Sequence, residues 1–165
     1  MARRVFYSFE YKPDCHRAAV VRQIGSIEGN RPARDNDWEA ITRGGDAAIR
    51  KWIMDQLYGK SCCVVLVGST TANRKWINYE IVSSWDKGMG VVGIYVHGLK
   101  NLKSATAPQG PNPFDYITHG NSKRKLSSIV KCYNPTGIDS KAKYAWIAKH
   151  LANAVEEAIR IRKEH

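Results

Sequence analysis

The chain has 165 residues, of which 43% are hydrophobic and 25% are charged, and its formal net charge is +11 at pH 7. This length and composition allow a core that needs neither disulfides nor metals, which excludes a disordered tail and a small disulfide scaffold. The positive charge favours attraction to polyanions, including a pyrophosphate, but the basic residues are dispersed and accompany no nucleic-acid motif.

The sequence also argues against a membrane or secreted protein. It contains no run near the roughly 18 apolar residues that cross a bilayer. The N-terminus, MARRVFYSFEY, passes from two arginines directly into a strand-like segment, without the apolar core and cleavage site of a signal peptide. We therefore expect a cytoplasmic protein with no membrane partner.

The first part of the chain predicts a strand and a helix followed by a loop. Residues 3–9 alternate and are rich in β-forming side chains. A helix is expected to start near Pro13 and Asp14. Its core-facing positions would be Ala18, Val21 and Ile24. The stretch 25–37, rich in glycine, asparagine, proline and aspartate, reads as a loop that could contain a short edge strand.

The middle of the chain alternates helices and apolar strands. An amphipathic helix is predicted over 44–59, with Ile49, Trp52, Ile53 and Leu57 on its apolar face. Continuous apolar runs at 61–69 and 90–98 fit strands that are covered on both faces. Between them, 72–87 reads as a second helix that ends at Gly88.

The last part of the chain is less regular. Residues 99–127 form a long irregular connection, which is often functional, and a short strand could lie within 126–133. A terminal helix is expected over about 139–163. Its buried stripe would comprise Ala145, Ile147, Leu151, Val155 and Ile159. The alternation predicts one α/β domain over 1–165, with a parallel sheet and right-handed crossovers.

The four cysteines show no pattern of metal ligands or disulfides; they are Cys15, Cys62, Cys63 and Cys132. Cys62 and Cys63 are adjacent in a predicted strand, so their side chains should point to opposite faces of the sheet. We expect buried free thiols and no metal site.

In a parallel sheet, ligands bind at the carboxyl ends of the strands, and the helix over 72–87 starts at that edge. Its N-terminal amides could help to hold anionic groups. Helical spacing places Asn73, Trp76, Glu80 and Ser83 or Ser84 on one stripe, next to a stripe of Ile77, Ile81 and Trp85 that faces the sheet. Glu80 thus lies at the border of the core.

A carboxylate in that position is paired, raised in pKa or functional. The alternative is a solvated glutamate on a helix surface. His97 ends a predicted strand at the same edge, where a structural histidine is the alternative. No GxGxxG phosphate loop joins a strand to a helix: the one such spacing, GMGVVG at 88–93, runs into the predicted strand over 90–98. The GxxxxGK pattern is absent. Both observations count against a Rossmann fingerprint and a P-loop nucleotidase.

Four stretches together resemble Toll/interleukin-1 receptor (TIR) domains, and specifically the TIR-like proteins of the Thoeris anti-phage defence system. They are RRVFYSFEY, CCVVLVGSTTANRKWINYEI, KGMGVVGIYVHGLKN and GPNPFDYI, and the first begins at residue 3 and the last ends at residue 117. The second stretch carries a tryptophan four residues before a glutamate, as in that family. The resemblance implies a flavodoxin-like fold, in which helices flank a parallel sheet on both faces.

The resemblance further implies an enzyme of the NAD⁺ glycohydrolase and ADP-ribosyl cyclase type. Such enzymes cleave the bond between nicotinamide and ribose, and Thoeris members make a cyclic ADP-ribose-type signal that activates a separate effector. NAD⁺ is then the substrate, and no cofactor or metal is needed because nicotinamide already leaves from a cationic form. A phage-derived trigger is a further expected partner.

Residue by residue, the family's catalytic glutamate falls on Glu80, whose carboxylate would hold the ribose hydroxyls and stabilise oxocarbenium-like charge. Trp76 would form a wall of the pocket, or else serve packing alone. Phe9 would lie against nicotinamide, or else be an ordinary aromatic at a strand end. Ser8 and Ser69 match polar positions that line the same edge.

In the family, the loop after the first helix mediates self-association, and here it falls within 25–46. It lacks the Gly-Pro core of receptor TIR domains, so binding of receptor-type adaptors is not expected. Three alternatives to the cyclase remain: a non-catalytic TIR-like scaffold, a plain NAD⁺ hydrolase that releases linear ADP-ribose, and a basic nucleic-acid binder, which the sequence does not favour.

Overall fold

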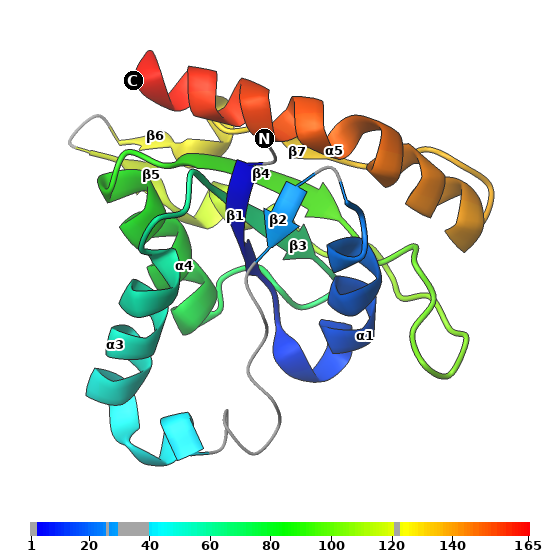
Figure 1. Cartoon of the computed structure of the whole chain (residues 1–165), viewed down its shortest axis with the longest axis horizontal. Coiled ribbons are helices and arrows are strands. Elements are labelled where there is room, and N and C mark those ends of the chain that lie inside the picture. Colours follow the sequence, from blue (N-terminus) through cyan, green and yellow to red (C-terminus); the bar gives the residue numbers. More distant parts are fainter. Residues whose placement is uncertain (1–2, 26, 30–39, 121–122) are drawn as a thin grey trace.

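A parallel sheet forms the centre of the computed structural model, which describes residues 3–25, 27–29, 40–120 and 123–165. Its five strands run in the order β2-β1-β3-β4-β7 (Figure 1). They are β1 (Arg3–Ser8), β2 (Ile27–Gly29), β3 (Cys62–Val67), β4 (Gly90–Tyr95) and β7 (Cys132–Tyr133). This is the order of flavodoxin-like, doubly wound folds, so the predicted fold class is confirmed.

Helices cover both faces of this sheet (Figure 1). They are α1 (Tyr11–Arg22), α3 (Gly45–Leu57), α4 (Lys75–Asp86) and α5 (Ser140–Lys163). One core cluster lies between the sheet and helices α1 and α5, and a second lies between the sheet and helices α3 and α4. We refer to these two sides as the α1/α5 face and the α3/α4 face.

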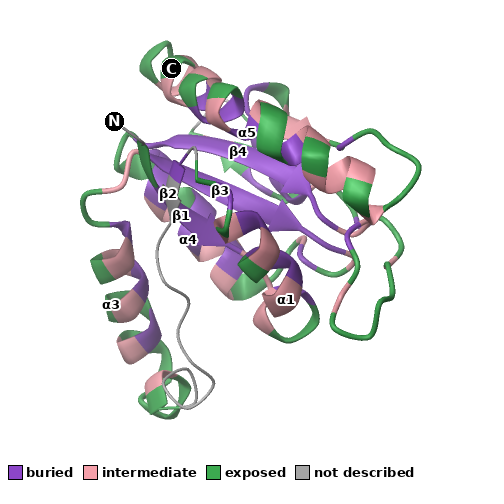
Figure 2. Cartoon of the chain, turned by 45° about the vertical axis from the view of Figure 1, so that its right-hand side comes forward, coloured by how far each residue is buried: buried purple, intermediate pink, exposed green. Residues whose placement is uncertain are grey.

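The central strands are buried on both sides, as their continuous apolar runs predicted. Every residue of β3 and β4 is buried, and the two strands pair over their whole length (Figure 2). Cys62 belongs to the core of the α1/α5 face and Cys63 to that of the α3/α4 face. The prediction that these two thiols are buried on opposite faces is confirmed.

Helix starts differ from the predicted ones for local reasons. Helix α1 begins at Tyr11, before Pro13, because a proline in the first turn needs no amide hydrogen for the helix. Helix α4 begins at Lys75 instead of residue 72, because Asn73 has a φ of 60° and its left-handed backbone cannot be part of the helix. Asn73 therefore precedes the stripe to which spacing assigned it.

The edge strand that the sequence left undefined is β2, which pairs parallel to β1 with Arg3 opposite Ile27. Half of the predicted self-association loop, residues 26 and 30–39 of 25–46, lies outside the described residues. Among the described residues, no helix is long and apolar enough to cross a membrane.

The irregular connection contains short elements that complete the core. They are the 3-10 helices η1 (Pro113–Tyr116) and η2 (Leu126–Ser128) and the antiparallel strands β5 (Thr118–His119) and β6 (Arg124–Lys125). Phe114 is fully buried on the α3/α4 face, and the predicted strand over 126–133 shortens to Cys132–Tyr133.

One part of the predicted stripe of α5 is wrong. Ala145 is exposed, whereas Ile147 is buried, because two residues that are two positions apart point about 200° apart around a helix. Ile159 is half-buried. The buried positions of the helix are Ile147, Leu151, Ala154, Val155 and Ala158.

Candidate functional site

The carboxyl ends of β1 and β3 are held together by one acidic side chain, Glu10. Its carboxylate accepts a hydrogen bond from Thr70 Oγ1 at 2.8 Å and forms an ion pair with Arg74 Nη2 at 3.2 Å. Sequence analysis did not single out Glu10, although an acidic residue directly after a strand at this edge was the available signal. The contact fixes the loop before α4 relative to the end of β1.

Glu80 lies on α4 and is only 8% exposed. Burial raises the pKa of its carboxyl to about 8, and the nearby Ser8 hydroxyl opposes that rise by stabilising the charged form. The carboxyl also lies close enough to Cys63 to raise the pKa of that thiol, which burial raises most. The position at the border of the core, predicted from helical spacing, is thus a buried one.

Ser8 is fully buried at the end of β1, and within the described chain its hydroxyl makes no hydrogen bond of regular geometry. The hydroxyl is therefore available to the neighbouring Glu80 carboxyl, whose charged form it stabilises. The Ser84 hydroxyl donates to the Glu80 backbone carbonyl at 2.7 Å, so this hydrogen bond does not involve the carboxyl. The structure thus brings Ser8 and Glu80 together from separate elements.

Trp76 is half-buried and packs at the edge of the core on the α3/α4 face. Its ring meets the Tyr79 ring edge to face, with centroids 5.7 Å apart, and the Lys75 ammonium lies 4.8 Å from its centroid. Lys75 in turn pairs with Asp46 of α3. These contacts give Trp76 a packing role, and its predicted role as a pocket wall stays a prediction.

Two other predicted residues lie at the same edge but are engaged differently. Phe9 is half-buried and packs against the core of the α1/α5 face, with its ring centroid 6.4 Å from that of Tyr11. It lies on the opposite face from Glu80. Ser69 is half-buried, and its hydroxyl donates to the Pro108 carbonyl.

The family model of the Thoeris protein ThsB, TIR-like domain, matches residues 6–101, a range that contains all of these site residues. The chain belongs to this family. The "Putative cyclic ADP-D-ribose synthase ThsB1" of Bacillus cereus (strain MSX-D12) is 37% identical over 122 residues, which cover 71% of this chain. They cover 64% of that relative, so the chain spans less than two thirds of its relative's length.

His97 lies at this edge of the TIR-like domain, and its Nδ1 is buried without a hydrogen-bond partner among the described residues. His97 follows β4, stacks edge to face on Tyr95 at 5.8 Å and is half-buried. Burial lowers its pKa, and the positive charges of Lys143 and Arg17 lower it further. Across the described residues, no three His, Cys, Asp or Glu side chains gather in a way that could hold a metal ion.

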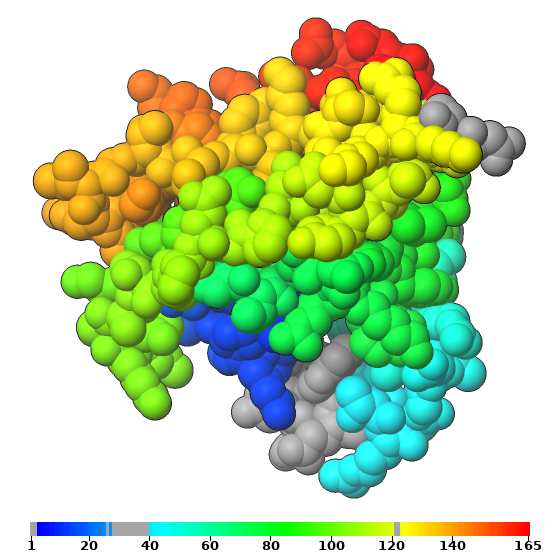
Figure 3. Space-filling model, turned by 180° about the vertical axis from the view of Figure 1, so that it is seen from behind, coloured from blue at the N-terminus to red at the C-terminus, as the bar shows by residue number. Residues whose placement is uncertain are grey.

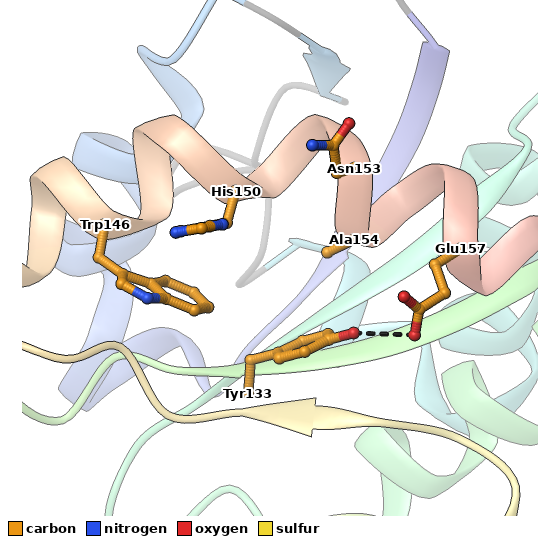
Figure 4. Close-up of a pocket in the computed structure, with 6 residues that line it drawn as sticks. All are labelled: Tyr133, Trp146, His150, Asn153, Ala154 and Glu157. Atoms are coloured by element: carbon orange, nitrogen blue, oxygen red, sulfur yellow. Dashed lines mark hydrogen bonds between the residues drawn. The ribbon is translucent and has the colours of Figure 1, made fainter.

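The TIR-like domain also has a hollow of about 150 Å³ between α5 and β7, away from Glu80 (Figure 4). It is lined by Tyr133, Trp146, His150, Asn153, Ala154 and Glu157. The Tyr133 hydroxyl donates to Glu157 at 2.9 Å across its floor. Pockets for whole organic ligands start at about 300 Å³, so this hollow is too small for a dinucleotide.

Proposed function

We propose that this TIR-like chain cleaves NAD⁺ at the nicotinamide–ribose bond and closes the remaining ADP-ribose into a cyclic signalling molecule. The observation that carries the proposal is the buried Glu80 carboxyl beside the Ser8 hydroxyl, at the sheet edge where ligands of such folds bind. Membership of the ThsB family and the cyclic ADP-D-ribose synthase name of the relative support it.

The chemistry requires a group that stabilises positive charge on the ribose. When the bond between the anomeric carbon and the nicotinamide nitrogen breaks, its electron pair leaves with the nitrogen and neutral nicotinamide departs. The ribose carbon and ring oxygen then share an oxocarbenium-like charge, which a carboxylate in a water-poor site stabilises strongly. Glu80 would supply that carboxylate.

A pKa of about 8 means that Glu80 in the free protein holds its proton over most of the neutral range. The cationic nicotinamide ring of bound NAD⁺ would favour the ionised form, because an opposite charge nearby lowers a carboxyl pKa. Substrate binding would therefore generate the active carboxylate, and Ser8 would assist by hydrogen bonding to it. Because ionisation of Glu80 would follow substrate binding, its carboxyl would stay neutral before NAD⁺ binds.

The fate of the oxocarbenium-like species separates two reactions. Attack by a nucleophile of the same ADP-ribose molecule closes a ring, whereas attack by water gives linear ADP-ribose. The burial of Glu80 favours exclusion of water and therefore cyclisation. In this scheme Trp76 bounds the pocket and Ser69 binds substrate. Phe9, which follows β1 at the same edge, would contact nicotinamide by reaching over the end of the strand from the α1/α5 face. NAD⁺ is the substrate, and no cofactor takes part.

We place the reaction in the cytoplasm, where its diffusible product would activate a separate effector protein. A phage-derived trigger would start the reaction, and self-association through residues 25–46 would complete the site. These three partners follow from the family resemblance alone.

The test is to incubate concentrated protein with NAD⁺ and to resolve the products by chromatography and mass spectrometry. We expect nicotinamide and an ion lighter than ADP-ribose by one water. The product should disappear in Glu80→Gln and persist in Glu164→Gln, a matched change at an exposed position. ADP-ribose in place of the lighter ion would establish a hydrolase.

If the purified protein is silent, the assay is repeated in phage-infected cells that express the same three chains. A Glu80-dependent product there supports the enzyme and a requirement for a trigger. Its absence from infected cells contradicts catalysis and leaves the non-catalytic scaffold as the function.

A further inference from the structure

Helix α1 carries a buried ion pair near its start, at the carboxyl edge of the sheet. Asp14 and Arg17 are 1% and 3% exposed, and Arg17 Nη1 lies 2.8 Å from Asp14 Oδ1. Taking both charges out of water costs about as much free energy as their attraction returns, so such a pair is weak evidence for stability. Its contacts indicate another role.

The Arg17 guanidinium holds the loop that follows β4. Its Nε donates to the Leu99 carbonyl at 2.7 Å, and its Nη2 donates to the Ala105 carbonyl at 3.1 Å. One side chain thus fixes both ends of residues 99–105 against α1. Figures 1 and 3 both show this light green loop beside the blue N-terminal segment that contains α1.

The Asp14 carboxylate lies against Gly68, the residue that follows β3. Its Oδ2 is buried and has no hydrogen-bond partner in the described part of the chain. A Cβ on Gly68 would lie only 2.2 Å from this oxygen, so the carboxylate fits there because residue 68 is glycine. Burial raises the pKa of Asp14, and the contact with Arg17 opposes the rise.

The clamped loop continues to Ser69, the predicted substrate-binding residue. The Pro108 carbonyl accepts a hydrogen bond from the Ser69 hydroxyl. Gly110 packs closely on the same turn, since a Cβ there would lie 2.4 Å from the Gly68 carbonyl oxygen and 2.5 Å from that of Ser69. Residues 99–110 are therefore held at one end by Arg17 and packed at the other against the end of β3.

We propose that Asp14 and Arg17 are positioning residues of the NAD⁺ site: they hold residues 99–110 against helix α1 and the end of β3 and so fix the Ser69 hydroxyl. This inference rests on the proposed function. Neither residue needs to touch the substrate, because each acts through the backbone of the 99–110 segment. Lysine cannot replace Arg17, since its single ammonium cannot reach the Leu99 and Ala105 carbonyls and Asp14 in one planar arrangement.

The kinetic test is a double-mutant cycle between Arg17→Lys and Ser69→Ala. Each single change should raise KM about tenfold and leave kcat within about threefold, because both disturb the same substrate contact, the Ser69 hydroxyl. Two changes that act through one contact should not have additive free-energy effects. The double variant should be no worse than Ser69→Ala. The inference would be overturned if the KM increase of the double variant equalled the product of the two single increases, or if KM were normal in Arg17→Lys.

Arg3→Lys is the matched control, because Arg3 forms an exposed ion pair with Glu156 near the start of β1, far along the strand from the carboxyl edge. It should leave KM unchanged. Asp14→Asn is the second variant in case Arg17→Lys folds poorly, since asparagine keeps the shape and an acceptor for Arg17. It should raise KM in the same direction.

Amide hydrogen exchange supplies a readout that needs no turnover. In Arg17→Lys, exchange should accelerate at least tenfold at amides of the 99–110 segment, such as those of Ala105 and Ala107, and stay unchanged in β3. Equal exchange in both chains would overturn the clamp. If wild type makes no Glu80-dependent product either as purified protein or in phage-infected cells, but exchange responds as stated, the clamp stands and the proposed function alone fails.

Discussion

The Glu80 carboxyl of α4 and the Ser8 hydroxyl at the end of β1 are buried next to each other, and the pKa of Glu80 is raised to about 8. Two opposing effects set this value: burial disfavours the charged carboxylate, and the hydroxyl favours it. A group that must ionise to act and that titrates near neutrality makes the activity of the site depend on pH.

The first prediction concerns turnover. For the proposed reaction, kcat/KM should rise with pH through about 8, because Glu80 must lose its proton to stabilise the oxocarbenium-like charge. Ser8→Ala removes the hydroxyl that favours the charged form, so the midpoint of the profile should move to higher pH. Initial rates of nicotinamide release between pH 6 and 9.5 give both midpoints; a flat profile, or equal midpoints, would contradict the assignment.

The second prediction concerns stability. Between pH 4.5 and 8 the unfolded chain releases the Glu80 proton while the native chain keeps it, so the native state loses stability as the pH rises. Glu80→Gln abolishes this loss. The variant should exceed wild type by roughly 3–5 kcal/mol in free energy of unfolding at pH 8.5, and the difference should shrink toward zero near pH 4.5.

Urea unfolding at several pH values measures this difference directly. Glu164→Gln, at an exposed position, serves as the reference because its carboxylate stays in water in both states. A Glu80→Gln variant whose advantage does not change with pH would show that the carboxyl is not buried in its neutral form.

Much of the fold could be predicted from periodicity. Continuous apolar runs marked β3 and β4 as covered on both faces, and the adjacent cysteines of β3 could be assigned to opposite faces because side chains alternate along a strand. The same rule explains Phe9. It follows Ser8 in the chain, so it points away from the face on which Glu80 packs.

The rest of the site depends on contacts that periodicity cannot predict. The link between Ser69 and Pro108 comes from the irregular segment 99–127, which has no repeating pattern from which to place a carbonyl. The pair of Asp14 and Arg17 had a visible i, i+3 spacing, but only the sheet topology buries it and brings Leu99 beside it. The resemblance supplied the proposed role of Glu80, while the structure supplied its surroundings.

The third prediction separates the two roles of Trp76. Trp76→Phe keeps an aromatic ring against Tyr79 and should cost less than about 1.5 kcal/mol of stability. If the indole bounds the substrate pocket, KM for NAD⁺ should still rise severalfold. Thermal unfolding and steady-state kinetics on the same preparation decide this, and an unchanged KM would assign Trp76 to packing alone.

The last prediction tests how α5 is seated on the sheet. A Cβ on Gly90, the first residue of β4, would lie 2.7 Å from the Ile159 amide nitrogen and 2.8 Å from the Ala158 carbonyl carbon. Both atoms belong to the backbone of α5, which cannot yield as a flexible side chain would. Gly90→Ala should therefore push the helix outward and lower the free energy of unfolding by about 1–3 kcal/mol.

Gly25→Ala is the matched control for that change, because a Cβ there would meet no atom of the described residues within 4 Å. Its effect should stay within about 0.5 kcal/mol. Denaturant midpoints of the two variants and wild type, compared at constant slope, measure both effects. Equal midpoints for the two variants would mean that α5 does not approach β4 as closely as the Gly90 contact requires, and the packing of the α1/α5 face would need revision.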